Sequence, residues 1–358
     1  MVKKFYKNIT LVMMIAMFML MFSGCGQEGD KKKTRIIKDI MGAEVEIPEK
    51  VDKIINLYSF GCQMMMGLGL KDYLAGINEE TIETEWIELM CPEVKDIPKY
   101  SDEASAETIL AANPDIVFCA DPDQAADYRS KGVPCITFMY LTIDDLKYNV
   151  NLLGDILGGD AKKKCNQYIE YLDEKIADVD AKLKNVITEK ETVHYINANN
   201  DKGFYKTAGA GSTTDYCAQL SYVKLATASL IEFPESKVDA EALLATNPEN
   251  VIIGGRYQHV IYDDIISATE WKNISAVKNN RVFKIPMGFS AWNRYSLETA
   301  LLIPWTASVV YPEVYLFDAV NETISFYRLF MGFELTEQQA QYMIKGLTPN
   351  GEKEIASR

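Results

Sequence analysis

The sequence predicts an α/β protein with two lobes, each built on a parallel sheet, and three observations lead to this expectation. From Arg35 onward, short apolar runs alternate with helical stretches, a pattern typical of parallel strands with helices on the sheet faces. The alternation stops over 142–184, which has only helical spacing, and then resumes. A helix–turn–strand sequence also occurs twice. We therefore expect two Rossmann-like lobes joined by one long α-helix, with a cleft between them.

The expected strands are short runs rich in Val, Ile, Leu and Phe, and several follow a proline or a turn. In the first lobe, 35–141, they fall at 53–57, 74–77, 115–118 and 135–138, and in the second lobe, 185–358, at 192–197, 251–253 and 281–285. Helices are expected between them, for example over 62–69 and 106–112. The second lobe ends in a helical tail from Leu297, with Thr336 as the N-cap of a helix over 337–345.

The segment 142–184 carries the pattern of a connecting helix. Thr142 and Asp145 have the spacing of a capping box, which marks a helix start. Apolar residues then recur every three or four positions, as on one face of a helix. Gly158 and Gly159 interrupt the pattern, so we expect one long helix and leave open a break at the two glycines.

The repeated sequence supports paired lobes. AETILAANPDIVF over 106–118 and AEALLATNPENVI over 240–252 agree in order at Glu, Leu, Ala, Asn and Pro. Ser105 and Asp239 precede the two stretches as N-cap residue types. The residue before proline avoids helical dihedral angles, so each helix should end at Asn-Pro and lead into a strand.

The N-terminus has the organisation of a bacterial lipoprotein signal. Three lysines precede an apolar run of 14 residues over 9–22, which is shorter than the ~20 residues of a membrane-spanning helix. Ser23 and Gly24 lead to Cys25, and this resembles a lipobox, with Phe22 where Leu is usual. We expect a signal peptide over 1–24, lipid on Cys25, and a flexible polar tether over 25–34. An ordinary cleaved signal with a chance cysteine is the alternative.

The composition excludes several classes of function. Removing residues 1–24 leaves 334 residues and, because three lysines go with them, moves the formal charge from −14 to −17. An acidic body argues against nucleic acid and against a polyanionic membrane surface as partners. The six cysteines after Cys25 form no C-x-x-C pair, so no metal site is expected, and their disulfide pairing stays open.

Catalytic motifs are also missing from the sequence. The chain has two histidines, His194 and His259, and it contains no G-x-S-x-G, H-E-x-x-H or Walker A motif. His194 lies in an apolar run and is expected to pack in the core. We therefore expect a protein that is not an enzyme and has no intrinsic cofactor. An exported α/β enzyme and an adhesion or sensor protein are the alternatives from other classes.

Several segments resemble one family, the class III solute-binding proteins of ATP-driven (ABC) importers for iron–siderophore, haem, cobalamin and other metal chelates. They are GAEVEIP over 42–48, the two repeated stretches, TAGAGS over 207–212, WKNISAVKNNRVFKIP over 271–286 and GFSAWNRYSLE over 288–298. The sequence ATAS over 226–229 departs from the glycine pair and Asn usual there. The long C-terminal tail resembles the branch with molybdate and nickel-chelate receptors.

The resemblance implies a monomeric, lipid-anchored receptor at the outer face of the cell membrane that delivers a metal chelate to an ABC permease and its ATPase. A ferric siderophore is the expected ligand, and haem, cobalamin, molybdate or a nickel chelate are the alternatives. The resemblance also implies that one Glu per lobe, Glu107 and Glu241, docks onto arginines of the permease. Both are expected in the first turn of a helix, where the helix dipole alone would also favour them.

The ligand is expected where the strand ends of the two lobes face each other. Residues that follow the expected strands are therefore candidates, and aromatic faces suit the organic body of a chelate while Arg suits its carboxylates. These candidates are Tyr58, Ser59, Tyr257, His259, Trp292, Arg294 and Tyr295. Tyrosine is abundant in this chain, so simple packing is the alternative for each of them.

Overall fold

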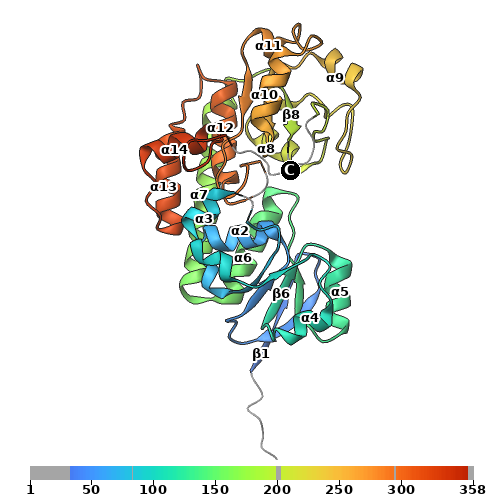
Figure 1. Cartoon of the computed structure of the whole chain (residues 1–358), viewed down its shortest axis with the longest axis vertical. Helices are drawn as coiled ribbons and strands as arrows, with labels where there is room; N and C mark the ends of the chain where they lie inside the picture. The colour runs from blue at the N-terminus through green and yellow to red at the C-terminus, as the bar shows by residue number, and fades with distance from the viewer. Residues whose placement is uncertain (1–32, 83, 199–202, 294–295, 354–358) are drawn as a thin grey trace, which may run out of the picture. The chain divides into compact units, whose positions relative to one another are not determined.

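The computed structural model describes residues 33–82, 84–198, 203–293 and 296–353, and its strands and helices alternate as the sequence predicts (Figure 1). The predicted signal segment, Cys25 and most of the tether lie outside the described residues. None of the described helices is long and apolar enough to cross a membrane. Two separate parallel sheets lie within one compact unit, Arg35–Arg358, and the predicted α/β fold with parallel sheets is confirmed.

The N-terminal lobe contains a five-stranded sheet in which every neighbouring pair is parallel. Its order is β5 (Lys99–Tyr100), β4 (Leu74–Asn78), β3 (Ile54–Asn56), β6 (Ile116–Cys119) and β7 (Cys135–Thr137). The strands β3 and β6 are buried at every position, as expected for a sheet covered on both faces. The chain leaves β3 toward β4 on one side and returns to β6 on the other, so the strand order reverses between β3 and β6.

The described part of the first lobe also contains four helices and a separate two-stranded sheet. The helices are α2 (Ser59–Gly67), α3 (Glu85–Met90), α4 (Ala106–Ala111) and α5 (Pro122–Ser130), with short 3₁₀ turns at Lys71–Tyr73 and Pro92–Asp96. Of these, α2 and α5 pack against strands of the five-stranded sheet. A separate two-stranded sheet is formed by β1 (Thr34–Lys38) and β2 (Glu44–Pro48). In β2 the buried and exposed residues alternate, as in a strand with one face on the core.

The connecting region forms two helices, α6 (Ile143–Leu157) and α7 (Gly159–Leu183), with the break at the glycine pair that the sequence left open. Gly158 and Gly159 both have positive φ, at 68° and 51°, which side chains other than Gly rarely tolerate. The chain reverses at these glycines, and α6 and α7 pack against each other. An ion pair between Lys147 of α6 and Asp173 of α7 links the two helices. The predicted capping box is confirmed at Thr142. The 25-residue α7 is thus the long helix that leads to the second lobe.

The C-terminal lobe repeats the arrangement with a four-stranded parallel sheet. Its order is β11 (Val282–Lys284), β10 (Asn250–Gly254), β8 (Thr192–Asn197) and β9 (Lys224–Leu225). Its helices are α8 (Thr213–Leu220), α9 (Ala240–Thr246), α10 (Gln258–Ser267), α11 (Ser275–Lys278), α12 (Thr299–Val310), α13 (Ala319–Met331) and α14 (Glu337–Ile344). Strand order reverses between β8 and β10, the counterpart of the reversal in the first lobe.

The repeated sequence forms equivalent structures in the two lobes. Ser105 caps α4 and Asp239 caps α9, each accepting a hydrogen bond from a backbone N–H three residues later. Asn113 and Asn247 both take a left-handed conformation, with φ of 50° and 47°. Each then leads through proline into the strand, β6 or β10, that pairs with the first strand of its parallel sheet, β3 or β8. The similarity that the sequence predicted therefore extends to the backbone of the turn.

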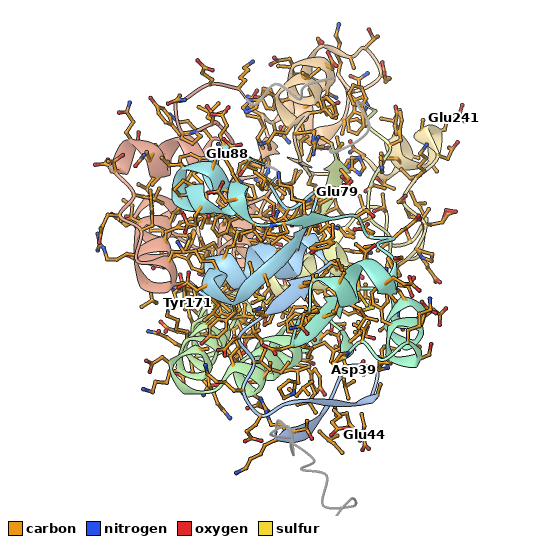
Figure 2. The ribbon with its side chains drawn as sticks, turned by 60° about the horizontal axis from the view of Figure 1, so that its bottom comes forward. Asp39, Glu44, Glu79, Glu88, Tyr171 and Glu241 are labelled. Atoms are coloured by element: carbon orange, nitrogen blue, oxygen red, sulfur yellow. The ribbon has the colours of Figure 1, made fainter. Side chains whose placement is uncertain are left out.

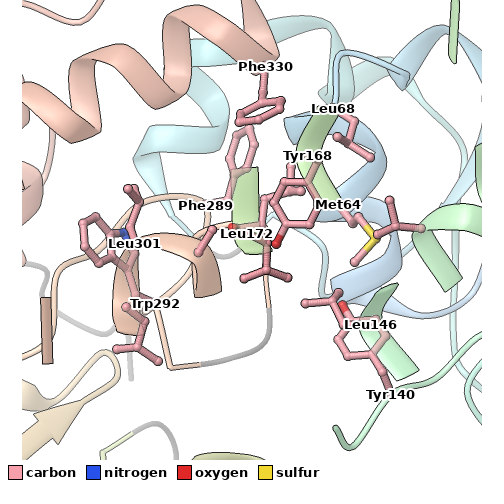
Figure 3. Packing of buried hydrophobic residues seen from close by; sticks show 14 of the residues in the cluster. Met64, Leu68, Tyr140, Leu146, Tyr168, Leu172, Phe289, Trp292, Leu301 and Phe330 are labelled. Carbon is pink, nitrogen blue, oxygen red and sulfur yellow. Dashed lines mark hydrogen bonds between the residues drawn. The ribbon is translucent and has the colours of Figure 1, made fainter. Parts of the chain in front are cut away.

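One hydrophobic cluster joins the lobes through α7 (Figure 3). Tyr168 of α7 is fully buried, and its hydroxyl donates a hydrogen bond of 3.1 Å to the Leu297 carbonyl at the start of the second lobe's helical tail. Its ring meets Phe330 of α13 edge to face, with 5.7 Å between centroids. Met64 of α2 packs in the same cluster. A continuous core of this kind resists relative motion of the lobes.

The C-terminal segment adds polar links to both lobes. Trp86 of α3 donates a hydrogen bond of 2.9 Å from its indole N–H to the Leu347 carbonyl. His259 of α10 places Nε2 2.8 Å from the Gly346 carbonyl. Consecutive residues of the tail are therefore held by helices from different lobes, which fixes the tail across them.

Candidate functional site

The carboxyl end of β3 places Tyr58 and Ser59 at the point where strand order reverses in the first lobe. Tyr58 is the N-cap residue of α2, and Ser59 is its first helical residue. Asn56 orders this turn, because its side-chain oxygen accepts a hydrogen bond of 3.0 Å from the Tyr58 backbone N–H. Ligands of open α/β sheets bind at such reversal points, outside the carboxyl ends of the strands.

The carboxyl end of β8 is the matching place in the second lobe. The Asn197 N–H donates a hydrogen bond of 2.8 Å to the Lys206 carbonyl, which holds the returning segment against the strand end. The Thr207 hydroxyl donates to the Tyr195 carbonyl at 2.5 Å. After these residues the chain passes through a glycine-containing turn into α8.

A cavity of about 360 Å³ lies between these strand ends and takes its walls from both lobes. The volume falls within the ~300–1,000 Å³ range of small-molecule sites. Its first-lobe wall consists of Tyr58, Phe60, Tyr140 and Leu141, and its second-lobe wall of Tyr195, Ile196, Asn197, Lys206, Thr207, Ala208, Thr213, Thr214 and Asn293. We refer to it as the interlobe cavity.

Aromatic rings dominate the first-lobe wall. Tyr58 contacts Phe60 and Tyr140 edge to face, with centroid separations of 5.3 and 5.8 Å. Tyr140 is almost fully buried, and burial raises the pKa of its hydroxyl well above the ordinary value. It is therefore a neutral phenol at physiological pH. Such a wall offers flat apolar surface and hydroxyl groups, which suit the organic part of a ligand.

A second cavity of about 720 Å³ lies beside the first and belongs to the first lobe alone. It shares Tyr58 and Phe60 with the interlobe cavity and extends toward the start of α4. Carboxylates line much of it, at Glu80, Asp102, Glu103, Asp121 and Asp127, with Lys131 as the cation beside them. Lys131 pairs with Asp127 at 2.9 Å. This surface is strongly acidic, in contrast to the interlobe cavity.

The predicted ligand residues lie in different places. Tyr58 lines both cavities, and Ser59 lines only the acidic one. Tyr257, His259 and Trp292 line neither cavity among the described residues. Arg294 and Tyr295 lie outside the described residues. Ligand contact therefore stays a prediction, and among these candidates the geometry favours Tyr58.

His259 and Trp292 have structural surroundings that account for their positions. His259 is 7% exposed and bonded to the C-terminal segment, and burial lowers the pKa of its ring. Trp292 is fully buried and packs in the interlobe core beside Leu301 (Figure 3). Both residues are predicted at the site because residues that follow a strand often face the cleft. That rule does not say whether the loop after the strand turns toward the cleft or into the hydrophobic core.

Sequence reasoning missed most of the interlobe cavity. Tyr140 follows β7 within three residues, so the same strand-end rule could have found it. Lys206 and Thr207 return to β8 after an irregular stretch, and no local pattern marks that return. Asn293 sits over Gly254, where an added Cβ would lie 2.7 Å from the Asn293 amide. Because residue 254 of β10 is glycine, the Asn293 side chain can pack against the strand there and reach the cavity.

The two glutamates predicted to contact a permease are both exposed, in the first turn of their helices. The pKa of Glu107 is lowered, chiefly by a hydrogen bond from its own backbone N–H and then by Ser105. Glu107 therefore stays ionised at neutral pH. Figure 2 shows Glu241 at the outer edge of the second lobe. Docking itself stays a prediction.

The described residues contain no arrangement of three or more His, Cys, Asp or Glu side chains that could hold a metal ion. All six described cysteines are buried and free. The sulfurs of Cys119 and Cys135 approach to 3.6 Å across neighbouring strands.

Comparison with known proteins agrees with this architecture. The model of the periplasmic binding protein family matches residues 54–287, and the chain belongs to that family. An uncharacterized ABC transporter substrate-binding lipoprotein of Bacillus subtilis, YvrC, is 23% identical over 74% of this chain and 86% of its own. The iron(3+)-hydroxamate-binding protein YxeB of the same organism is 24% identical, over 77% and 88%.

A solved structure shows the same fold. The molybdate-binding protein MolA of Haemophilus influenzae, determined with molybdate bound, superposes with a TM-score of 0.73 at 22% identity, covering 84% of this chain and 99% of its own. Family and relatives together define the class: a substrate-binding protein of an ABC transporter, working outside the cytoplasm with a permease partner and a small-molecule ligand. The family consists of transport proteins rather than enzymes.

Proposed function

We propose that this chain captures a ferric siderophore in the interlobe cavity and delivers it, as a lipid-anchored monomer, to an ABC permease. The observation that carries the proposal is the cavity itself. It lies at the strand-order reversals of both lobes, it is large enough for an organic chelate, and one wall is aromatic. Relatives named as an iron(3+)-hydroxamate-binding protein and a probable siderophore-binding lipoprotein support the same ligand class.

Thermal-shift screening tests the ligand class. The purified chain, without its signal segment, is heated with a ferric catecholate, a ferric hydroxamate, haem, a corrinoid, a nickel chelate or molybdate. A ligand at 100 times its Kd stabilises a protein by about 2.7 kcal/mol, which gives a clear upward shift in Tm. We expect a ferric chelate to give the largest shift. Stabilisation by molybdate, haem, the corrinoid or the nickel chelate alone would assign another ligand, and no shift with any of them would contradict the proposal.

Lipid attachment at Cys25 is tested separately. Cells expressing the chain are labelled with an alkyne analogue of palmitate, and the labelled protein is detected after gel separation. We expect label on the wild type and none on Cys25→Ser. A single-chain lipid anchor binds only reversibly, whereas the two or more chains of a bacterial lipoprotein hold the protein stably. Equal labelling of both proteins would show that the lipid is elsewhere.

A further inference from the structure

The two walls of the interlobe cavity differ in chemistry. The first-lobe wall is aromatic and aliphatic, and the described residues that form it carry no charge. The second-lobe wall carries one cation, Lys206, together with hydroxyl and amide side chains: Asn197, Thr207, Thr213, Thr214 and Asn293. Among the described lining residues there is no carboxylate. The cavity therefore has an apolar side and a side rich in hydrogen-bond donors.

The backbone holds Lys206 firmly at this wall. Its carbonyl accepts the hydrogen bond from Asn197 described above, and it forms an isolated antiparallel bridge with Lys237. The side chain is half-buried and forms no ion pair with any residue in the described part of the chain. A cation in a concave site with no counter-charge among the described residues is available to a ligand anion.

The start of α8 contributes to the same wall. Thr213 and Thr214 are the first two residues of this eight-residue helix, and Ser212 is its N-cap. The first N–H groups of a helix have no partner within the helix and carry partial positive charge. Within the described structure neither of these two N–H groups has an acceptor outside it either. Both residues line the cavity, so the positive end of α8 lies at its wall.

One carboxylate lies near this helix start and is already satisfied. Asp215 accepts hydrogen bonds of 3.0 Å from the Gly211 N–H and from the Gln219 side chain. It is 7% exposed and is not a lining residue. The negative charge of Asp215 would weaken binding of every anionic probe, but its carboxylate does not line the cavity and leaves room for the ligand.

We infer that Lys206 and the start of α8 form an anion-recognition subsite, and that the ligand is a negatively charged chelate. This inference rests on the proposed function, since it assigns a charge and an orientation to the same ligand. Anionic oxygens of the chelate contact Lys206 and the α8 N–H groups, and its organic body lies against Tyr58 and Tyr140. Lys206 is then the described lining residue whose charge favours anionic chelates over uncharged ones.

The test uses three variants and three probes. Lys206→Met removes the charge at nearly constant length, Lys206→Arg keeps it, and Lys237→Met removes an exposed charge directly across the backbone bridge. The probes are a trianionic ferric tris-catecholate, an uncharged ferric tris-hydroxamate and molybdate. Affinities are measured by quenching of tryptophan fluorescence at low and high salt, with far-ultraviolet circular dichroism to verify folding.

We expect Lys206→Met to weaken the tris-catecholate by about 10- to 100-fold, the range for a hydrogen bond to a charged group, and the tris-hydroxamate by less than about threefold. Lys206→Arg, which keeps the charge, should recover most of the tris-catecholate affinity lost in Lys206→Met, whereas Lys237→Met should stay near the wild type. Salt should weaken binding of the two anionic probes, the tris-catecholate and molybdate, and leave the uncharged tris-hydroxamate unaffected. Equal loss for both chelates, or an equal effect of Lys237→Met, would overturn the subsite.

The outcomes also separate the subsite from the proposed function. If the hydroxamate binds and no probe loses affinity in Lys206→Met, the siderophore function is supported and the subsite is contradicted. Binding of molybdate alone, lost in Lys206→Met, would keep the subsite and remove the siderophore function. Binding of none of the three probes would remove both.

Discussion

Replacing Glu107 and Glu241 together by Ala is expected to abolish import while leaving ligand affinity unchanged. Each carboxylate is exposed in the first turn of a short helix, α4 in one lobe and α9 in the other. Neither lines the interlobe cavity. An exposed carboxylate can pair bidentately with an arginine of the permease, and one contact per lobe would set the orientation of docking. Uptake of labelled ferric chelate by cells measures the effect.

A matched control separates docking from the helix dipole. Glu85 and Glu337 are also exposed glutamates in the first turns of helices, α3 and α14. Replacing both by Ala removes the same charge and the same dipole interaction, worth about 0.3–1 kcal/mol each. We expect this control protein to import normally. Unchanged uptake by the Glu107/Glu241 protein, or an equal loss in the control, would contradict docking through these residues.

Acid is expected to destabilise the protein strongly through His194. This residue lies on β8, fully buried, with its ring stacked on Trp271 at a centroid distance of 5.9 Å. Its Nε2 lies 2.8 Å from the Phe204 carbonyl, and its Nδ1 has no partner in the described structure. Burial lowers the pKa of His194 to about 4. The native protein therefore holds a neutral imidazole, and protonating it in the folded state is unfavourable.

The sign of the effect follows from which state binds the proton first. In the unfolded chain a histidine has a pKa of about 6.5, so the unfolded state is protonated before the folded state as pH falls. Stability is full above about pH 6.5 and is lost between there and pH 4. The loss amounts to about 3 kcal/mol, at 1.36 kcal/mol per pKa unit. The pKa of His259 is also lowered, mainly by burial, so it acts in the same direction.

Urea unfolding at pH 7 and at pH 4 measures this contribution. Carboxylates also change stability over this range, so the relevant quantity is the difference between the wild type and His194→Gln, which retains an N–H donor and does not titrate. We expect the variant to lose about 3 kcal/mol less than the wild type between the two pH values. His259→Gln serves as the comparison for the second buried histidine, whose pKa is also lowered. An identical loss in His194→Gln and the wild type would show that His194 is not the cause.

The alternation of strands and helices could be predicted from the sequence because buried parallel strands are continuous apolar runs bounded by prolines or turns. The strand predicted at 192–197 matches β8, and the other predicted strands lie within two residues of the observed ones. The strands β5 and β9 could not be predicted, since two residues carry no periodicity. The reversal at Gly158 also stayed open, because a glycine pair can either bend a helix or end it.

The site was less predictable than the fold. The position of Tyr58 at a cavity wall could be predicted because it follows the central strand β3, and ligands of such sheets bind beyond the strand ends. Lys206 could not, because its position depends on a backbone bridge to Lys237, more than thirty residues away. Trp292 is predicted at the site because it follows a strand, but it lies in the hydrophobic core together with residues of α12. This long-range packing leaves no signal in the local sequence.

Recovery of bound chelate tests most directly whether this protein captures a ferric chelate without altering it. The purified chain is incubated with a ferric siderophore, freed of excess ligand, and examined by native mass spectrometry. The protein is then denatured, and the molecular mass of the released chelate is measured by mass spectrometry. We predict one chelate and one iron per chain, with the recovered chelate unchanged in mass, and loss of retention in Tyr58→Ala combined with Lys206→Met. No retained chelate, or a chelate changed in mass, would contradict the account.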